Sequence, residues 1–359
     1  MASPDRVRLV VLFGGRSAEH EVSCTTAAHV LAAADPARYA LEAVGITRDG
    51  TWVRNDAAQA ALSAGAAALP APLTATGTAI EPLPAVAGSG DGLPVVVLPL
   101  LHGPQGEDGT VQGLLELAGV PYVGSGVLAS ALCMDKVKAK EVLAHHHMPQ
   151  VPYVALRDTD LAGAHDAVAA QGLAYPLFVK PANLGSSVGV TKVHVAAELD
   201  SAVAAAAAYD EWLVVEEGVG GREIEVAVLG NAEPRASVPG EIISSHEFYD
   251  YEDKYIDGTC QLVVPAGLDD EAAERVRGLA LDAYRALRCE GMARVDFFYE
   301  EGRRGFLVNE VNTIPGFTPG SMYPKLWEAT GVPYPELIDE LVRLAVERHE
   351  HRSRFSTKR

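Results

Sequence analysis

Residues 294–298 read Arg-Val-Asp-Phe-Phe, and residues 306–312, after a short interruption, read Phe-Leu-Val-Asn-Glu-Val-Asn. Apolar and aromatic residues dominate both segments, as is typical of β-strands. The interruption at 300–304 reads Glu-Glu-Gly-Arg-Arg, which is typical of a hairpin loop. We therefore predict that the two segments are paired strands of one sheet.

Four polar side chains stand out on these strands. Because side chains along a strand alternate between its two faces, Arg294 shares a face with Asp296, and Glu310 shares a face with Asn312. Where these faces coincide, three oxygen ligands and a guanidinium lie together. Such oxygens, with coordination positions left open, suit Mg²⁺ that is also held by substrate phosphates. A solvated sheet face with ordinary charge pairs is the alternative for each residue taken singly.

The composition limits the class of protein. The chain has 359 residues, of which 48% are hydrophobic and 21% are charged, and this length suits two or three domains. A formal net charge of −19 argues against nucleic acid as a partner, so a polyanionic substrate must be met by a local basic pocket. No apolar run approaches the roughly 20 residues that a membrane span needs, so no membrane partner is expected.

The start of the chain and the cysteines indicate the compartment. The first apolar segment is about as long as one strand and ends in two glycines rather than a cleavage site, unlike a signal peptide. The four cysteines lie far apart, with no CxxC pairing, at Cys24, Cys133, Cys260 and Cys289. We expect reduced thiols in a cytoplasmic protein.

The N-terminal part predicts a Rossmann-like arrangement. A near-continuous apolar run at 7–13 is typical of a parallel strand covered on both faces, and a helix is expected at 19–34. Further strands are expected at 41–47 and 95–101, with a peripheral insertion at about 55–93 between them. The GxGxxG fingerprint is absent, so a nicotinamide dehydrogenase is not indicated.

The rest of the chain continues an α/β pattern. The loop His-Gly-Pro-Gln-Gly-Glu-Asp-Gly at 102–109 follows a strand, where open α/β sheets place ligands. A domain boundary is expected near 121–126, and a single helix at about 131–147. The further strands that we predict are 177–180, 190–195, 212–217 and 223–229, and the further helices are 198–209, 269–287 and 335–349.

A second motif, at 180–189, reads Lys-Pro-Ala-Asn-Leu-Gly-Ser-Ser-Val-Gly. Its backbone N–H groups and hydroxyls can wrap phosphate oxygens while Lys180 supplies a point charge. It is not a P-loop, because GxxxxGK[ST] is absent. A plain glycine hairpin with a surface lysine is the alternative. Lys136 is a weaker candidate of the same kind, because most lysines on helices face solvent.

Two other segments suit an active site. Residues 248–258 read Phe-Tyr-Asp-Tyr-Glu-Asp-Lys-Tyr-Ile-Asp-Gly, which is too charged for a core strand and too aromatic for a loose linker, so an ordered lid is expected. Glu216 ends one predicted strand and Glu223 begins the next. Such a hinge is able to contact an adenine and a ribose, although solvated strand ends are the simpler account of each glutamate alone.

Taken together, these segments resemble the D-alanine–D-alanine ligase family, whose members are ATP-grasp carboxylate–amine ligases. The resemblance runs nearly end to end, and its motifs occur in order. The matching segments are 12–23, 101–113, 124–126, 134–136, 180–189, 249–255, 294–296 and 309–316.

The resemblance implies the fold and the domains. We expect an α/β fold in which a Rossmann-like N-terminal domain precedes a two-part ATP-grasp fold. The N-terminal domain would span 1–124, with the insertion at about 55–93. The central ATP-grasp subdomain would span 125–216, and the C-terminal subdomain 217–359, with a lid loop at about 246–260.

The resemblance also implies a reaction. ATP would phosphorylate the carboxylate of one D-alanine, and the amine of a second would attack the acylphosphate, giving D-alanyl-D-alanine for peptidoglycan precursors. ATP and two Mg²⁺ or Mn²⁺ ions per site are the implied cofactors, and a homodimer is the implied assembly. A ligase for another D-amino acid or for a D-hydroxy acid, and a non-catalytic ATP-binding protein, are the alternatives. The pair Lys254-Tyr255 favours the dipeptide.

Site residues follow from the resemblance, position by position. The implied catalytic residues are Glu19, Ser186, Tyr255, Arg294 and Gly316, and the implied metal ligands are Asp296, Glu310 and Asn312. The implied contacts to the D-alanines are His102, Ser321 and Met322. The implied nucleotide contacts are Lys136, Lys180, Ser187, Glu216, Val219, Glu223, Lys254, Phe298 and Asn309. Glu217-Gly218 departs from another frequent family pattern, so only a backbone contact is expected there.

Overall fold

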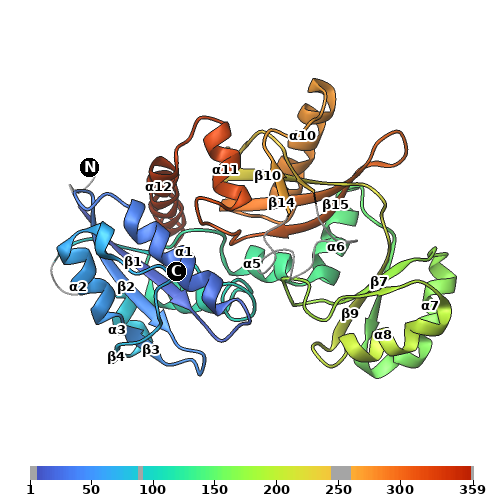
Figure 1. Cartoon of the computed structure of the whole chain (residues 1–359), viewed down its shortest axis with the longest axis horizontal. Helices are drawn as coiled ribbons and strands as arrows, with labels where there is room; N and C mark the ends of the chain where they lie inside the picture. The colour runs from blue at the N-terminus through green and yellow to red at the C-terminus, as the bar shows by residue number, and fades with distance from the viewer. Residues whose placement is uncertain (1–5, 88–91, 244–259, 357–359) are drawn as a thin grey trace.

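The computed structural model describes residues 6–87, 92–243 and 260–356 and shows an α/β protein, as predicted. Three sheets form its framework, and helices cover them (Figure 1). In the part of the chain that is described, no helix is long and apolar enough to cross a membrane.

The first sheet belongs to the N-terminal lobe, which we define as residues 7–123, and has the strand order β4-β3-β2-β1-β5. Its strands are β1 (Val7–Gly14), β2 (Tyr39–Ile46), β3 (Trp52–Arg54), β4 (Thr78–Ala79) and β5 (Val95–Pro99). Its helices are α1 (His20–Ala33), α2 (Asp56–Ala64), η1 (Ala66–Ala68), α3 (Pro82–Val86) and α4 (Thr110–Ala118). The apolar run at β1 pairs in parallel with both β2 and β5, so the predicted parallel strand is confirmed.

The second sheet forms the central lobe, residues 151–217, with the antiparallel order β6-β9-β7-β8. Its strands are β6 (Tyr153–Arg157), β7 (Leu177–Pro181), β8 (Thr191–Val193) and β9 (Trp212–Glu217). Its helices are η2 (Asp158–Gly163), α7 (Ala164–Gln171), η3 (Ala196–Glu198) and α8 (Leu199–Ala206). In Figure 1 this green lobe stands apart from the others.

The third sheet has the order β13-β12-β10-β14-β15, with β11 paired to β10. Its strands are β10 (Arg222–Gly230), β11 (Arg235–Ala236), β12 (Gly240–Ile243), β13 (Gln261–Val263), β14 (Gly291–Glu300) and β15 (Gly305–Asn312). The helices that pack with it are α5 (Val127–Met134), α6 (Lys136–His145), α10 (Asp270–Ala286), α11 (Met322–Ala329) and α12 (Tyr334–Ser353). We call this sheet with these helices the C-terminal lobe.

The single helix predicted at 131–147 is wrong: the chain forms α5 and α6, separated at Asp135. Asp135 has an extended backbone, and its carboxylate accepts a hydrogen bond of 3.0 Å from the backbone N–H of Lys138. An aspartate that caps a new helix in this way competes with continuation of the preceding one. The break turns α6 toward the central lobe, where the backbone N–H of Lys136 donates to Ala182 O at 3.1 Å.

The N-terminal and C-terminal lobes share a hydrophobic core, whereas the central lobe has its own. One core joins β1 and α1 of the N-terminal lobe to α11 and α12, with Phe13, Leu31, Trp327 and Leu341 fully or almost fully buried in it. A second core lies between the third sheet, α10, α5 and α6. The central lobe has a core of its own, which draws only on residues 154–215.

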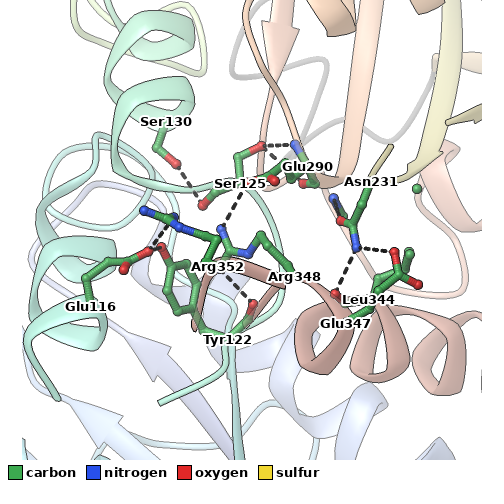
Figure 2. A network of polar contacts seen from close by, with 12 residues as sticks. Glu116, Tyr122, Ser125, Ser130, Asn231, Glu290, Leu344, Glu347, Arg348 and Arg352 are labelled. Atoms are coloured by element: carbon green, nitrogen blue, oxygen red, sulfur yellow. Dashed lines mark hydrogen bonds and ion pairs between the residues drawn. The ribbon is translucent and has the colours of Figure 1, made fainter. Parts of the chain in front are cut away.

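Polar contacts strengthen the junction of the N-terminal and C-terminal lobes (Figure 2). The guanidinium of Arg348, on α12, lies 4.0 Å from the ring centroid of Tyr122 and donates to Tyr122 O at 3.2 Å. Arg352 donates to Glu116 at 2.8 Å, and the hydroxyl of Tyr122 donates to the same carboxylate at 2.8 Å. The last helix of the chain is therefore anchored on the first lobe.

Candidate active site

The β14–β15 hairpin places its polar residues as the alternation predicts. Arg294 lies opposite Asn312, and Asp296 lies opposite Glu310. Arg294 Nε and Nη2 donate to the two oxygens of Asp296 at 2.7 Å each. Asn312 Nδ2 donates to Asp296 Oδ2 at 2.9 Å. The two faces therefore coincide, and the guanidinium and the oxygen ligands lie together.

A β-bulge follows immediately. The partner of Asp296 is Glu310, but the partner of Phe297 is Val308, so Asn309 is the extra residue on β15. Bulges re-aim side chains and are frequent beside active sites. Here the bulge gives Asn309 and Glu310 a place on the same cavity wall as Phe298.

That cavity has a volume of about 690 Å³ and lies between the central and C-terminal lobes. Its size is within the range of about 300–1,000 Å³ that is usual for small-molecule sites. The predicted site residues that line it are Lys136, Lys180, Ser186, Ser187, Glu216, Val219, Glu223, Arg294, Asp296, Phe298, Asn309 and Glu310. Its lining holds three lysines and two arginines but also seven carboxylate side chains, so the cavity offers cations for a polyanion without being the basic pocket that the net charge of the chain led us to expect.

Three charged side chains form a buried row at one side of the cavity. Glu216 binds Lys180 through Oε1, and its Oε2 lies 3.1 Å from Lys140 Nζ. Burial alone raises the pKa of Glu216, but Lys140 and Lys180 outweigh it and bring that pKa to about 2. Nearby, Lys136 donates to Leu184 O at 2.6 Å, and burial lowers the pKa of its ammonium.

The glycine–serine loop reaches the N-terminal lobe. Ser186 and Ser187 both have left-handed backbones, with φ of 51° and 59°. Non-glycine residues in this region cost on the order of 1–3 kcal/mol each and cluster at functional sites. The Ser186 hydroxyl donates to Glu19 Oε1 at 2.5 Å. A Cβ atom on Gly103 or Gly185 would lie 3.6 Å from Glu19 Oε2, so loops from two lobes meet at this carboxylate.

The loop at 102–109 adds two titratable groups beside Glu19. His102 is buried, and burial lowers the pKa of its imidazole. Glu107 accepts a hydrogen bond of 2.7 Å from the backbone N–H of Gly103. Burial, and then the charge of Glu19, raise the pKa of Glu107 to about 8. The imidazole is thus held neutral, and the two carboxyl groups repel each other when both are ionised.

Ser321 is the N-cap of α11, Met322 is its first residue, and Gly316 lies in the loop that precedes it. Ser321 Oγ accepts from the backbone N–H of Thr318 at 3.1 Å, and a Cβ on Gly316 would lie 3.2 Å from it. Met322 is buried in the core and lies close to Gly240, so only its backbone is available for a ligand. The first backbone N–H groups of a helix are suited to a carboxylate.

Two predicted site residues, Lys254 and Tyr255, lie outside the described residues, as does the lid loop up to residue 259. Three residues that the sequence did not single out also belong to this region: Glu107, Lys140 and Glu225. Glu225 is buried on β10, opposite Asp296, and its Oε2 lies 3.1 Å from Arg294 Nε. A charged residue between Ile224 and Val226 was the signal that could have found it.

Two family models match the chain and decide its relationship. The model described as the D-ala D-ala ligase N-terminus matches residues 8–125, and the one described as the D-ala D-ala ligase C-terminus matches residues 142–343. The chain belongs to the D-alanine–D-alanine ligase family. The ligase thus carries both halves of the family over most of its length, and the predicted resemblance is confirmed.

Individual relatives agree with the models. The ligase is 47% identical over 358 residues to proteins named D-alanine–D-alanine ligase from Thermoanaerobacter sp. (strain X514) and Thermoanaerobacter pseudethanolicus (strain ATCC 33223 / 39E). Each alignment covers 98% of this chain and 99% of the relative.

Solved structures share the whole fold. The D-alanine–D-alanine ligase from Coxiella burnetii superposes with a TM-score of 0.80 at 36% identity, covering 98% of this chain and 97% of the other. The VanG D-Ala:D-Ser ligase from Enterococcus faecalis also gives a TM-score of 0.80, at 35% identity, covering 95% of this chain and 99% of the other. The predicted fold class, with an ATP-grasp fold after a Rossmann-like part, is confirmed.

Proposed function

We propose that this ligase joins two D-alanine molecules at the expense of ATP, giving D-alanyl-D-alanine, ADP and phosphate for peptidoglycan precursors. The observation that carries the proposal is the pair of Arg294 and Asp296 on the cavity wall, with Asn312 bonded to Asp296 beside it, in a chain related to ligases of this name over 98% of its length. The chemistry needs cations at the nucleotide phosphates and a protected acyl centre. The lysines of the cavity are suited to the first, and Arg294 and Ser186, which is bonded to Glu19, are suited to the second.

For the nucleotide, we propose that Lys136 and Lys180 contact the phosphates together with the backbone and hydroxyl of Ser187. Phosphoryl transfer depends mainly on positioning and charge stabilisation, which ammonium groups and backbone N–H groups supply. The adenosine would lie against Val219, Glu223 and Phe298, which line the same cavity. We assign Glu216 an indirect part, because its carboxylate is bound to lysines.

For the metal, we propose Asp296, Glu310 and Asn312 as ligands of Mg²⁺ or Mn²⁺. Within residues 6–87, 92–243 and 260–356, no three His, Cys, Asp or Glu side chains are placed to hold a metal by themselves. Two carboxylates and an amide fit a hard cation that keeps positions open for phosphate oxygens. When bound, the ions would neutralise the charge that develops on the transferred phosphoryl group.

At the acyl centre, Glu19, held by Ser186, would bind the ammonium of the first D-alanine. The carboxylate of this first D-alanine attacks the terminal phosphorus of ATP, the bond from that phosphorus to ADP breaks, and an acylphosphate forms. The amine of the second D-alanine then attacks the acyl carbon, and the carbon–oxygen bond to phosphate breaks. Arg294 and the backbone N–H of Gly316 would stabilise the oxyanion, a contribution typically worth about 10²–10³-fold in rate per donor.

The second D-alanine must lose a proton before it attacks. His102 lies near Glu19 and Arg294, and burial keeps its imidazole neutral. A neutral imidazole can accept a proton, so we propose His102 as a candidate acceptor on this side of the site. The carboxylate of the second D-alanine would meet Ser321 and the backbone N–H of Met322.

Phosphate release from ATP and Mg²⁺ tests the proposed function, with D-alanine, L-alanine, D-serine, D-lactate or no acceptor, and with products identified by mass. We expect release only with D-alanine present and a D-alanyl-D-alanine product. Mixed products with D-serine or D-lactate would move the assignment to another second substrate. Binding of ATP without turnover on any of these compounds would contradict ligase activity.

We further propose the domain division 1–124, 125–216 and 217–359, a homodimeric assembly and a cytoplasmic location. The three separate sheets support the division, although α5 and α6 share the core of the third sheet. Large apolar side chains exposed at Leu117, Leu128 and Phe355 are available for a subunit contact. Sedimentation equilibrium of the full chain tests the assembly: a single 37.9 kDa species at all concentrations would contradict the dimer.

A further inference from the structure

Lys140 is a buried lysine that the reaction described above does not use. Its side chain is 4% exposed, and its Nζ lies 3.1 Å from Glu216 Oε2 and 5.1 Å from the ring centroid of Tyr153. Lys136 lies one turn earlier on the same helix, so both side chains leave α6 on one face. The two lysines differ in what they meet, because Lys136 lines the cavity and Lys140 does not.

The carboxylate of Glu216 lies between two cations from different lobes. Lys180, on β7 of the central lobe, binds one oxygen from the cavity side, where its side chain is 15% exposed. Lys140, on α6 of the C-terminal lobe, approaches the other oxygen from behind. Its neighbours Ala139 and Leu143 pack in the core of the C-terminal lobe, so the backbone beneath Lys140 is fixed there.

The balance of charge among Lys140, Glu216 and Lys180 determines how strongly Glu216 holds Lys180. A buried carboxylate is costly unless cations compensate it. With Lys140 in place, the charge of Glu216 is compensated from the side away from the cavity, and the Lys180 ammonium can also bind an anion in the cavity. Without Lys140, Glu216 would have Lys180 as its closest cation and would hold that ammonium tightly.

We propose that Lys140 is a positioning residue of the nucleotide site: it compensates Glu216 from outside the cavity and so frees the Lys180 ammonium for the phosphates of ATP. The inference rests on the proposed function, because it takes ATP as the ligand of this cavity. Lys140 itself does not touch the nucleotide. Its effect passes through Glu216 to Lys180.

Steady-state kinetics of Lys140→Met, Lys140→Arg and Lys138→Met test this role. Lys138 is the matched control, because it is an exposed lysine on the same helix that pairs with Glu141, its neighbour one turn later. We expect Lys140→Met to raise the KM for ATP about tenfold or more, as for loss of a buried ionic partner, while the KM for D-alanine changes less than about twofold. Lys140→Arg should restore most of the ATP affinity, and Lys138→Met should match the wild type.

A double-mutant cycle separates this role from a merely structural one. The dissociation constant of ATP with Mg²⁺ is measured by calorimetry for wild type, Lys140→Met, Glu216→Gln and the double variant. Once Glu216 carries no charge, loss of Lys140 should no longer matter, so the double variant should bind ATP as Glu216→Gln does. An equal loss of affinity from Lys140→Met in both backgrounds would overturn the proposal.

The outcomes are distinguishable from failure of the proposed function. If wild type shows no D-alanine-dependent phosphate release, the ligase assignment fails, whereas the calorimetric cycle still decides the role of Lys140. If wild type is active and Lys140→Met has an unchanged KM for ATP, the proposed role of Lys140 alone fails. Should Lys140→Met not fold by circular dichroism, Lys140→Gln takes its place in the kinetics and in the cycle, with the same expected and contradicting results.

Discussion

The N-terminal lobe and the central lobe are joined to the C-terminal lobe in opposite ways. The N-terminal lobe shares one hydrophobic core with α11 and α12, and buried polar contacts around Arg348 seal the junction (Figures 1 and 2). The central lobe has a core of its own. It meets the C-terminal lobe through a small apolar cluster, in which Val137 of α6 packs with Ala182 and Val214, and through polar pairs such as Glu217 with Arg304. It meets the N-terminal lobe where Ser186 donates to Glu19.

This difference indicates which parts can move. Two lobes that share one close-packed apolar core resist separation, because any relative movement would expose apolar surface and disrupt the packing. A lobe with its own core, joined to the next lobe by one small apolar cluster and polar pairs, can rotate as a unit, as in hinge closure around a ligand. We therefore expect the N-terminal and C-terminal lobes to act as one block against which the central lobe closes over ATP.

The largest effect is expected from Trp327→Ala, which removes a fully buried side chain from the shared core. We expect a loss of about 3–5 kcal/mol in the free energy of unfolding. Hydrogen exchange should accelerate in β1 and α1 as well as in α11, because these elements belong to the same hydrophobic core. Exchange confined to α11 would break the comparison, since it would show that the two lobes do not depend on one core.

Leu213→Ala provides the matched substitution in the central lobe, where Leu213 is also fully buried. The local cost should be about 2–5 kcal/mol. Faster hydrogen exchange is expected in β6, β7 and β9 but not in β1 or α12. Spread of the effect to the N-terminal lobe would mean that the central lobe is not an independent unit.

A smaller and pH-dependent effect is expected from Glu107→Gln, beside the point where the central lobe meets Glu19. In the folded protein the pKa of Glu107 is raised from 4.5 to about 8, mainly by burial. The stability that this proton contributes is present below pH 4.5 and is lost as the pH rises through about 8. At pH 9 the glutamine variant should be more stable by on the order of 1–2 kcal/mol, because it does not require a buried charge at this position.

Thermal unfolding of both proteins between pH 5 and pH 9 measures this difference. The two curves should agree most closely at the acid end, where glutamine resembles the protonated carboxyl. Parallel curves over the whole range would show that Glu107 does not titrate in it.

The smallest effect is expected from Glu217→Gln, which weakens the ion pair of 3.2 Å to Arg304 between the central and C-terminal lobes and leaves the pairing of Arg304 with Glu300 in place. The arginine side chain is 30% exposed, so the pair should contribute only about 0–1 kcal/mol. A change in the unfolding midpoint as large as that of Trp327→Ala would contradict this expectation. It would show that surface charges hold the central lobe as firmly as the shared core holds the N-terminal lobe.

The hairpin at 291–312 was predictable because its information is local. Alternation fixes which side chains share a face, and a short turn fixes which strands pair, so Arg294, Asp296 and Asn312 could be brought together from the sequence. The break at Asp135 was not foreseen, because an aspartate within an otherwise helical pattern is compatible with both one helix and two. Helical spacing also could not distinguish Lys140 from a surface lysine, since its partner is distant in sequence.

The shared core was beyond the reach of the sequence for a similar reason. Apolar periodicity shows that α1 and α12 each have a face to bury, but it does not show that these faces bury each other. The roles of Lys254 and Tyr255 stay predictions, because both residues lie outside the described part of the chain.

The position of α12 also affects the order in which the protein can be made. Domains usually fold as they leave the ribosome, with the N-terminal one first. Here the first sheet completes its core only with α11 and α12, and the Tyr39 hydroxyl finds its partner in Asp339 at 2.6 Å. A ribosome must therefore finish almost the whole chain before the opening strand is fully covered, and a premature stop near residue 320 would damage the beginning of the protein as much as its end.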